Sequence, residues 1–333
     1  MDTPILQETT NHLGRRYHAD LFLYPLLCYT HFNMEHKPKA IAIVGPTAAG
    51  KTSLSITIAK HVGGEVISAD SRQVYTGMDL GTGKVTVDEM DGVPHHLLDV
   101  AEPMEIYTGS RFVTDATVAM DKIISRGHCP IVAGGTFFYV DLLRNKMQAA
   151  PVEPDTNFRS SLTQYTTAEL YEQLENADSR RAASIDLHNR RRLERALEII
   201  NTLGAVPESV PQESPYDWLV LGIEITKQQL HANIHKRILD RIEQGMIEEV
   251  ERLHYEGVSW DRMNELGLEY RYISKYLQGE LSKDEMVEQL DTKTRQFAKQ
   301  QLTWLRKDTD VIWIDPADTK TVATLVDKFL TDK

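Results

Sequence analysis

The stretch AIAIVGPTAAGKT, residues 40–52, decides the fold. It opens with a short apolar run of alanine, isoleucine and valine, and the residues after Lys51 bring Leu54, Ile58 and Ala59 to helical spacing. A strand, a glycine-rich loop and a helix therefore follow one another. The loop, residues 45–52, matches G-x-x-x-x-G-K-[ST], the phosphate-binding P-loop, in the strand-to-helix context that gives this motif its meaning.

This loop predicts a site for a phosphoester. Its glycines let the backbone wrap an anion with N–H groups, Lys51 supplies a point charge, and the hydroxyl of Thr52 is a candidate ligand for Mg²⁺. The motif leaves the phosphoester open, because nucleotide kinases and ATPases carry the same loop. The predicted phosphate-binding residues are Gly45, Thr47, Ala48, Ala49, Gly50, Lys51 and Thr52.

Further strand-like runs cover residues 64–70, 130–135, 218–225 and 311–314, and helical stretches such as 110–125 lie between them. Strands that alternate with helices predict an α/β fold with a mostly parallel sheet flanked by helices, as in P-loop NTPases. Strand signals disappear between residues 151 and 211. We expect a helical insertion there, between a first part of the core, residues 37–150, and its completion with C-terminal helices, residues 212–333.

Residues 1–36 read as an N-terminal extension. The apolar run LFLYPLLC, residues 21–28, contains Pro25, is too short to span a bilayer, and is not followed by a convincing signal-peptide cleavage site. We expect this extension to be disordered or missing from the mature chain, because Met34 leads directly into the first strand. No membrane association is predicted.

Composition limits the other possibilities. The chain has 333 residues, 41% of them hydrophobic, and a formal net charge of −12, so RNA contact would have to use local basic patches. Cys28 and Cys129, the two cysteines, are too few for a disulfide framework or a zinc site and suit the reducing cytoplasm.

Two segments place polar groups where strands end. Asp70 ends the strand-like run at 64–70, which we expect to neighbour the P-loop strand, so it is a candidate base; the alternatives are a helix N-cap and a loop aspartate paired with Arg72. Gly134, Gly135 and Thr136 follow another strand, where glycines allow close backbone approach and a threonine hydroxyl can reach a phosphate. As a turn alone this second segment is uninformative.

Six blocks in order along residues 40–307 resemble the tRNA dimethylallyltransferase family. They are GPTAAGKT (45–52), ISADSRQVYTGMDLGTGK (67–84), PHHLLD (94–99), VAGGTFFY (132–139), RRLERALE (191–198) and TRQFAKQQLTWLR (294–306).

The resemblance implies an enzyme that binds dimethylallyl diphosphate in the P-loop, with Mg²⁺, and prenylates N6 of the adenosine immediately 3′ of the anticodon in tRNAs that read codons beginning with U. No ATP is hydrolysed. Carried over by position, Asp70 is the general base, and Thr136 and Arg237 hold the diphosphate leaving group. Arg241, one helical turn after Arg237, is a weaker candidate. We further expect a cytoplasmic monomer.

The resemblance also implies contacts to the tRNA anticodon stem-loop, including contacts from the helical insertion. For residues 292–307, composition independently supports contact with RNA, because this segment holds five basic residues and no acid. There we expect Arg295 and Lys299 to share a helix face away from Phe297 and Trp304. Each basic segment could also be an ordinary charged surface. The implied tRNA-binding residues are Asp70, Ser71, Arg72, Gln73, Arg191, Arg192, Arg195, Arg271, Lys299 and Arg306.

The chain departs from the family pattern in places. Gln300 stands where arginine is usual and Gly83 where alanine is usual, and Leu268 to Tyr270 interrupt the common G-Y-[RK] segment, which weakens the carry-over around Arg271. The sequence leaves three other functions open: a P-loop kinase of a small metabolite, an adenylate isopentenyltransferase that acts on a free nucleotide, and a noncatalytic RNA-binding P-loop protein.

Overall fold

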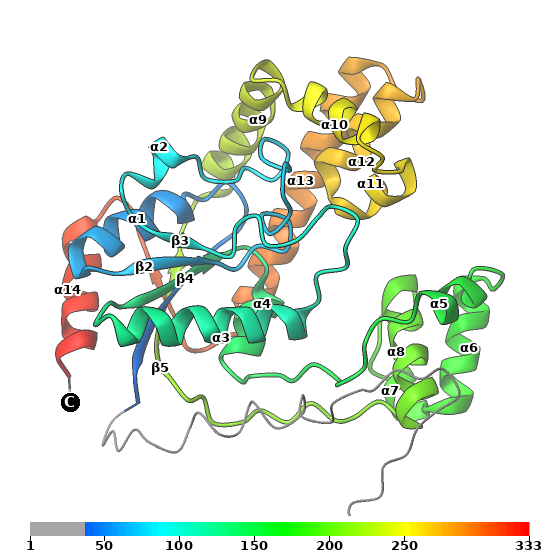
Figure 1. The fold of residues 1–333 in the computed structure, drawn as a ribbon, viewed down its shortest axis with the longest axis horizontal. Coiled ribbons are helices and arrows are strands. Elements are labelled where there is room, and N and C mark those ends of the chain that lie inside the picture. The colour runs from blue at the N-terminus through cyan, green and yellow to red at the C-terminus, as the bar shows by residue number, and fades with distance from the viewer. Residues whose placement is uncertain (1–36, 333) are drawn as a thin grey trace, which may run out of the picture. The chain divides into compact units, whose positions relative to one another are not determined.

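A parallel sheet forms the centre of the chain in this computed structural model, which describes residues 37–332. Within that range the strands are β1 Lys39–Val44, β2 Glu65–Ser68, β3 His95–His96, β4 Pro130–Gly134, β5 Asp217–Ile223 and β6 Val311–Ile314. All neighbouring strands are parallel, and the order across the sheet is β3-β2-β4-β1-β5-β6 (Figure 1). The α/β prediction is confirmed, and the expectations for residues 1–36 lie outside the described residues.

The strand order corrects one expectation. Because β4 lies between β1 and β2, the strand that leads to Asp70 is not the direct neighbour of the P-loop strand. The strand ends are nevertheless level, since β4 pairs Ala133 with Ser68 of β2 and Gly134 with Val44 of β1. The two-residue strand β3 was not predicted, because a run of two histidines carries no strand pattern.

Alternate residues of every inner strand point to opposite faces of the sheet. Because the residues on both faces are apolar, helices cover each face. In β1, Ala40 and Ala42 belong to one apolar core and Ile41 and Ile43 to the other. The helices are α1 Lys51–Val62, α2 Val87–Met90, α3 Gly109–Ser125, α4 Phe137–Leu143, α5 Thr156–Leu162, α6 Thr167–Ala177, α7 Ser179–Ala182, α8 Arg190–Leu203, α9 Lys227–Glu243, α10 Met246–Tyr255, α11 Trp260–Leu266, α12 Leu268–Leu277, α13 Lys283–Leu305 and α14 Thr319–Thr331.

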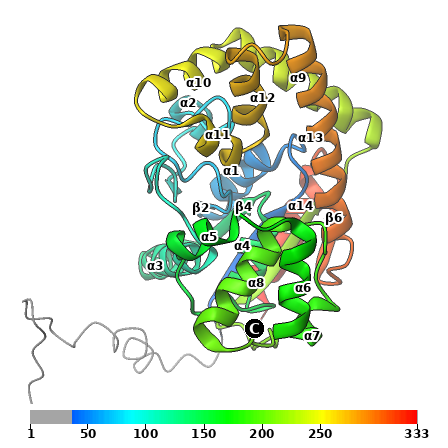
Figure 2. The ribbon, with the colours of Figure 1, turned by 90° about the vertical axis from the view of Figure 1, so that its right-hand side faces the viewer.

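The helices divide between three cores. Helices α1 and α14 contribute to the core on one face of the sheet, and α3, α4 and α9–α13 to the core on the other. Figure 2 shows α9–α13 grouped together, and α13 packs against α4, α9 and α12. Residues 151–211 contain α5–α8, and their buried side chains, including Leu170, Leu174 and Leu193, form a separate third core. The apolar side chains buried between these four helices therefore stabilise their arrangement.

Within residues 37–332, no helix is long and apolar enough to cross a membrane.

Candidate active site

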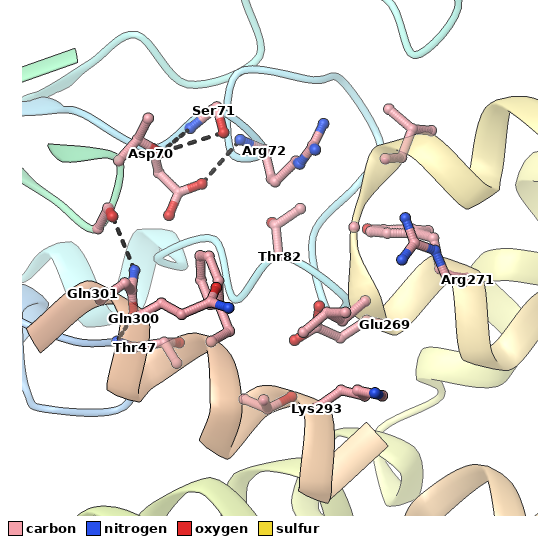
Figure 3. A pocket seen from close by; sticks show the side chains of 18 of the residues that line it. Thr47, Asp70, Ser71, Arg72, Thr82, Glu269, Arg271, Lys293, Gln300 and Gln301 are labelled. Atoms are coloured by element: carbon pink, nitrogen blue, oxygen red, sulfur yellow. Dashed lines mark hydrogen bonds between the residues drawn. The ribbon is translucent and has the colours of Figure 1, made fainter. Parts of the chain in front are cut away.

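The carboxyl ends of three strands build one site. The P-loop follows β1, Asp70 follows β2 two residues on, and Gly135 and Thr136 follow β4. Helices α9, α12 and α13 complete the walls of a cavity of about 630 Å³ at this edge of the sheet (Figure 3). Parallel α/β sheets bind their ligands at this edge, and the volume suits a small ligand together with a nucleobase.

The phosphate loop curves because two residues, Ala48 (φ 61°) and Gly50 (φ 93°), adopt left-handed backbone conformations. Gly50 is the N-cap residue just before α1 and has no side chain to cap the first backbone N–H groups, so this helix end favours an anion. Lys51 lies in the cavity wall, and its Nζ donates to the Pro46 carbonyl at 2.8 Å. Burial lowers the pKa of Lys51 to about 8; nearby Arg237 acts in the same direction and Asp70 opposes it.

The segments that carry Asp70 and Thr136 are joined because the end of β4 comes very close to the backbone that follows β2. A Cβ on Gly134 would lie 2.1 Å from the Ala69 carbonyl oxygen, so only glycine fits. The Thr136 N–H donates to that carbonyl at 3.2 Å, and the Thr136 hydroxyl accepts from the Ser71 N–H at 3.0 Å. The two predicted catalytic residues thus both line the cavity.

The Asp70 carboxylate points into the cavity (Figure 3). Its Oδ1 accepts from the backbone N–H of Arg72 at 2.9 Å, an Asx-type turn. Asp70 caps no helix, so the alternative of a helix N-cap does not describe it. The alternative of a pair with Arg72 describes it only in part, because Asp70 binds the backbone of Arg72. Burial lowers the pKa of Arg72, whose side chain also lines the cavity.

Arg237 reaches the same cavity from α9, and its Nη2 donates to the hydroxyl of Thr47 at 2.7 Å. Burial lowers the pKa of Arg237 to about 10, and Arg241 lowers it further, against the effect of Glu269 and Asp70. Two partly buried cations, Arg237 and Lys51, therefore flank the phosphate loop. Burial removes part of the hydration of these two cations. An anion bound between them would compensate for that loss through favourable charge interactions.

The remaining predicted phosphate-loop residues lie outside the cavity lining. Gly45, Ala48, Ala49 and Gly50 shape the loop through their backbone, and Thr52 is exposed in the first turn of α1. Among residues 37–332, no three His, Cys, Asp or Glu side chains gather as a metal cluster. A Mg²⁺ held mainly by substrate phosphates and water needs only one or two protein oxygens, and the Thr52 hydroxyl beside the free helix end fits that requirement.

The predicted tRNA-binding residues separate into three groups. Ser71, Arg72, Arg191, Arg192 and Arg271 line the cavity with Asp70. The structure thus brings the insertion helix α8, through Arg191 and Arg192 in its first turn, to the same cavity as the strand ends.

Two others have their polar groups engaged inside the protein. Gln73 accepts from the Ser68 hydroxyl at 2.9 Å and donates to the Gly83 carbonyl at 3.0 Å. Arg195 donates to the buried carboxylate of Glu198 and to the Val152 carbonyl. Both residues hold the fold, and their contact with tRNA stays a prediction.

Helix α13 corrects a prediction about its faces. Lys299 and Trp304 line one shallow hollow of about 410 Å³ together with Lys307, so Lys299 does not face away from Trp304. Arg295 is paired with Asp291 at 2.5 Å, an acid immediately before the segment that we counted as free of acids. Arg306 is exposed at the end of the helix. The basic surface is therefore narrower than the composition indicated.

Sequence reasoning missed the groups that hold the site from a distance. The buried Glu249 accepts from the N–H groups of Asp79, Leu80 and Gly81 at 2.7 to 3.0 Å and from the Tyr270 hydroxyl at 2.8 Å. Along the chain Glu249 reads only as a polar residue in an amphipathic helix. Glu269, which departs from the family pattern, and Gln301 also line the cavity.

Comparison with known proteins agrees with this geometry. The family model described as IPP transferase matches residues 73–308. The chain belongs to the IPP transferase family. A curated relative named tRNA dimethylallyltransferase 2, from Citrifermentans bemidjiense, is 41% identical over 273 residues, which are 82% of this chain and 88% of that protein.

Solved structures of IPP transferases share the fold. The tRNA isopentenylpyrophosphate transferase of Bacillus halodurans aligns with a TM-score of 0.67 at 35% identity, over 88% of this chain and 97% of that one. A eukaryotic dimethylallyltransferase acting on tRNA aligns with a TM-score of 0.75 at 27% identity, over 88% of this chain and 80% of that one. The family expected from the six sequence blocks is thus confirmed.

Proposed function

We propose that this protein is a tRNA dimethylallyltransferase. It transfers the dimethylallyl group of dimethylallyl diphosphate to N6 of the adenosine immediately 3′ of the anticodon, in tRNAs that read codons beginning with U, and releases diphosphate. The observation that carries the proposal is the meeting of a carboxylate, Asp70, with an anion site built from the phosphate loop, Lys51 and Arg237 in one cavity.

The diphosphate half of the cavity lowers the barrier to breaking the allylic C–O bond. Cleavage of this bond develops positive charge on the prenyl group and negative charge on the diphosphate. The loop amides, Lys51, Thr136 and Arg237 hold that negative charge in place, and removal of one such donor costs roughly 3 kcal/mol of barrier. Mg²⁺ bound at the Thr52 hydroxyl and the phosphates would neutralise further negative charge.

Asp70 serves the other half of the reaction. The exocyclic amine of adenine is a poor nucleophile because its lone pair is delocalised into the ring. As the C–N bond forms the N–H becomes acidic, and a carboxylate within hydrogen-bond reach accepts the proton. The Thr136 and Ser71 contacts beside Asp70 keep the base next to the leaving-group site.

The polar side of the cavity suits a nucleobase that has left its stack. A base in a structured anticodon loop must be extruded to reach this depth, and basic residues at the rim can hold the backbone on either side. Arg191, Arg192 and Arg271 lie at the cavity, and Lys299 and Trp304 lie on the adjoining hollow of α13. Because its proposed substrate is tRNA, we place the reaction in the cytoplasm; the monomeric state stays a prediction.

The decisive experiment incubates the protein with Mg²⁺, radiolabelled dimethylallyl diphosphate and unmodified tRNA, with AMP and ATP as alternative substrates in parallel. We expect label on tRNA, none on AMP, and no ATP turnover. Asp70→Asn should abolish transfer, whereas the same change at Asp88, exposed on α2, should leave it unaltered. Label on AMP would assign the free-nucleotide reaction instead, and ATP turnover without tRNA would assign a kinase.

A further inference from the structure

Gln301 joins two loops of the site from the opposite wall. It lies on α13, its residue is 5% exposed, and its side-chain amide makes two hydrogen bonds (Figure 3). Oε1 accepts from the backbone N–H of Thr47 at 2.8 Å, and Nε2 donates to the Gly135 carbonyl at 2.9 Å. The first bond reaches the phosphate loop and the second reaches the loop after β4.

Only an amide of this length satisfies both partners. The phosphate loop presents a donor and the β4 loop presents an acceptor, so the bridging side chain must offer one of each. Glutamate offers acceptors alone when ionised, and methionine, which has a similar length, offers almost neither. Without such a side chain, the Thr47 N–H and the Gly135 carbonyl would each lose a hydrogen bond at a partly buried position, which is costly.

Gly135 keeps the space that this bridge needs. A Cβ at Gly135 would lie 2.8 Å from Nε2 of Gln301 and 3.7 Å from Nζ of Lys51. The amide and the lysine therefore both approach the backbone of the β4 loop directly. The bridge fixes the distance between the loop that carries Lys51 and the loop that carries Thr136.

The position of Gln301 on its helix separates it from the RNA surface. Its neighbours Lys299, Thr303 and Trp304 line the outer hollow of α13, whereas Gln301 is buried on the inner side. The segment as a whole was expected to face RNA. One residue of it serves the diphosphate half of the cavity.

We propose that Gln301 is a positioning residue for the prenyl donor: it holds the phosphate loop and the loop after β4 at the spacing that the diphosphate requires. It acts through these loops. The inference rests on the proposed function, since it takes the anion of this site to be dimethylallyl diphosphate.

The test compares Gln301→Met and Gln301→Glu with Gln289→Met, the same substitution at an exposed position of the same helix. Transfer is measured with the donor varied at saturating tRNA and with tRNA varied at saturating donor. For both Gln301 variants we expect KM for dimethylallyl diphosphate to rise about tenfold and kcat to fall, with KM for tRNA within about twofold of wild type. Gln289→Met should behave as wild type.

Amide hydrogen exchange gives a second readout that needs no substrate. The Thr47 N–H should exchange faster in Gln301→Met than in wild type and Gln289→Met. If Gln301→Met does not fold, Gln301→Glu carries the kinetic test, because it keeps the size of the side chain and the bond from Thr47.

Other outcomes separate the two ideas. Donor KM and kcat unchanged in both variants would overturn the inference alone, and so would a rise in the tRNA KM without a rise in the donor KM, which would assign Gln301 to the RNA surface. A wild-type protein that transfers no label to tRNA would overturn the proposed function. The Thr47 exchange would then still decide whether Gln301 holds the loop.

Discussion

Lys51 should give the transfer reaction an alkaline limb. Burial lowers the pKa of this lysine from 10.5 to about 8, which corresponds to about 3 kcal/mol against the charged form in the empty site. The folded-state pKa is depressed, so the ammonium is present below about pH 8 and is lost as the pH rises through that value. Diphosphate binding needs the charge, and kcat/KM for the donor should therefore fall tenfold per pH unit above about pH 8.

The assay measures kcat/KM for dimethylallyl diphosphate at saturating tRNA from about pH 6.5 to about pH 9.5, because this parameter reports ionisations of the enzyme before the donor binds. Lys51→Arg should lose part of the activity but move the limb beyond the range, since a guanidinium stays charged. Lys122→Arg, an exposed lysine on α3, should keep the wild-type limb. A flat wild-type profile, or an unchanged limb in Lys51→Arg, would refute the assignment.

Three changes away from the chemistry test the framework of the site. Hydrogen bonds from Arg126 and two histidines outweigh burial and lower the pKa of Glu65 to about 2, below its unfolded value of 4.5. This stabilisation, at most about 3 kcal/mol, is complete above about pH 4.5 and lost as pH falls towards 2, so the stability lost in urea unfolding over this range should be larger for wild type than for Glu65→Gln by up to that amount. Gly134→Ala should cost roughly 3 kcal/mol of unfolding free energy, measured the same way, because its methyl group overlaps the β2 backbone; a stable, active variant would contradict the close approach. Gly83→Ala places a Cβ 1.6 Å from Nη2 of Arg241 at φ +64°, so its cost should shrink by roughly 1 kcal/mol in an Arg241→Ala background, whereas strictly additive costs would exclude the contact.

The local parts of the site could be predicted because each is continuous in the chain. The P-loop residues 45–52 lie between a strand and a helix whose periodicities are legible, and Asp70 and Thr136 each follow a strand. Parallel strands bring their carboxyl ends to the same edge, so these residues were expected in one place before the strand order was known. The order itself was predicted wrongly for β2, since nothing local records that β4 pairs with both β1 and β2.

The faces of α13 show where such reasoning fails. Residues 292–307 contain no acid, but Asp291, immediately before them, pairs with Arg295. Helical spacing gives the relative angle of two side chains, but which angle faces the protein depends on what packs there. Lys299 and Trp304 consequently share a hollow that spacing alone did not indicate.

By itself the sequence determined the α/β class, the phosphate loop, the strand-end aspartate and threonine, and the family, because these depend on neighbours within a few residues or on ordered blocks. Only the tertiary structure decided that Arg237 meets Thr47, 190 residues away, that Gln301 meets the same residue across 254, and that Arg195 donates to the Val152 carbonyl across 43. These partners depend on how the helices pack against the sheet and against one another. A buried amide or guanidinium is then satisfied by whatever backbone or carboxylate that packing brings within reach.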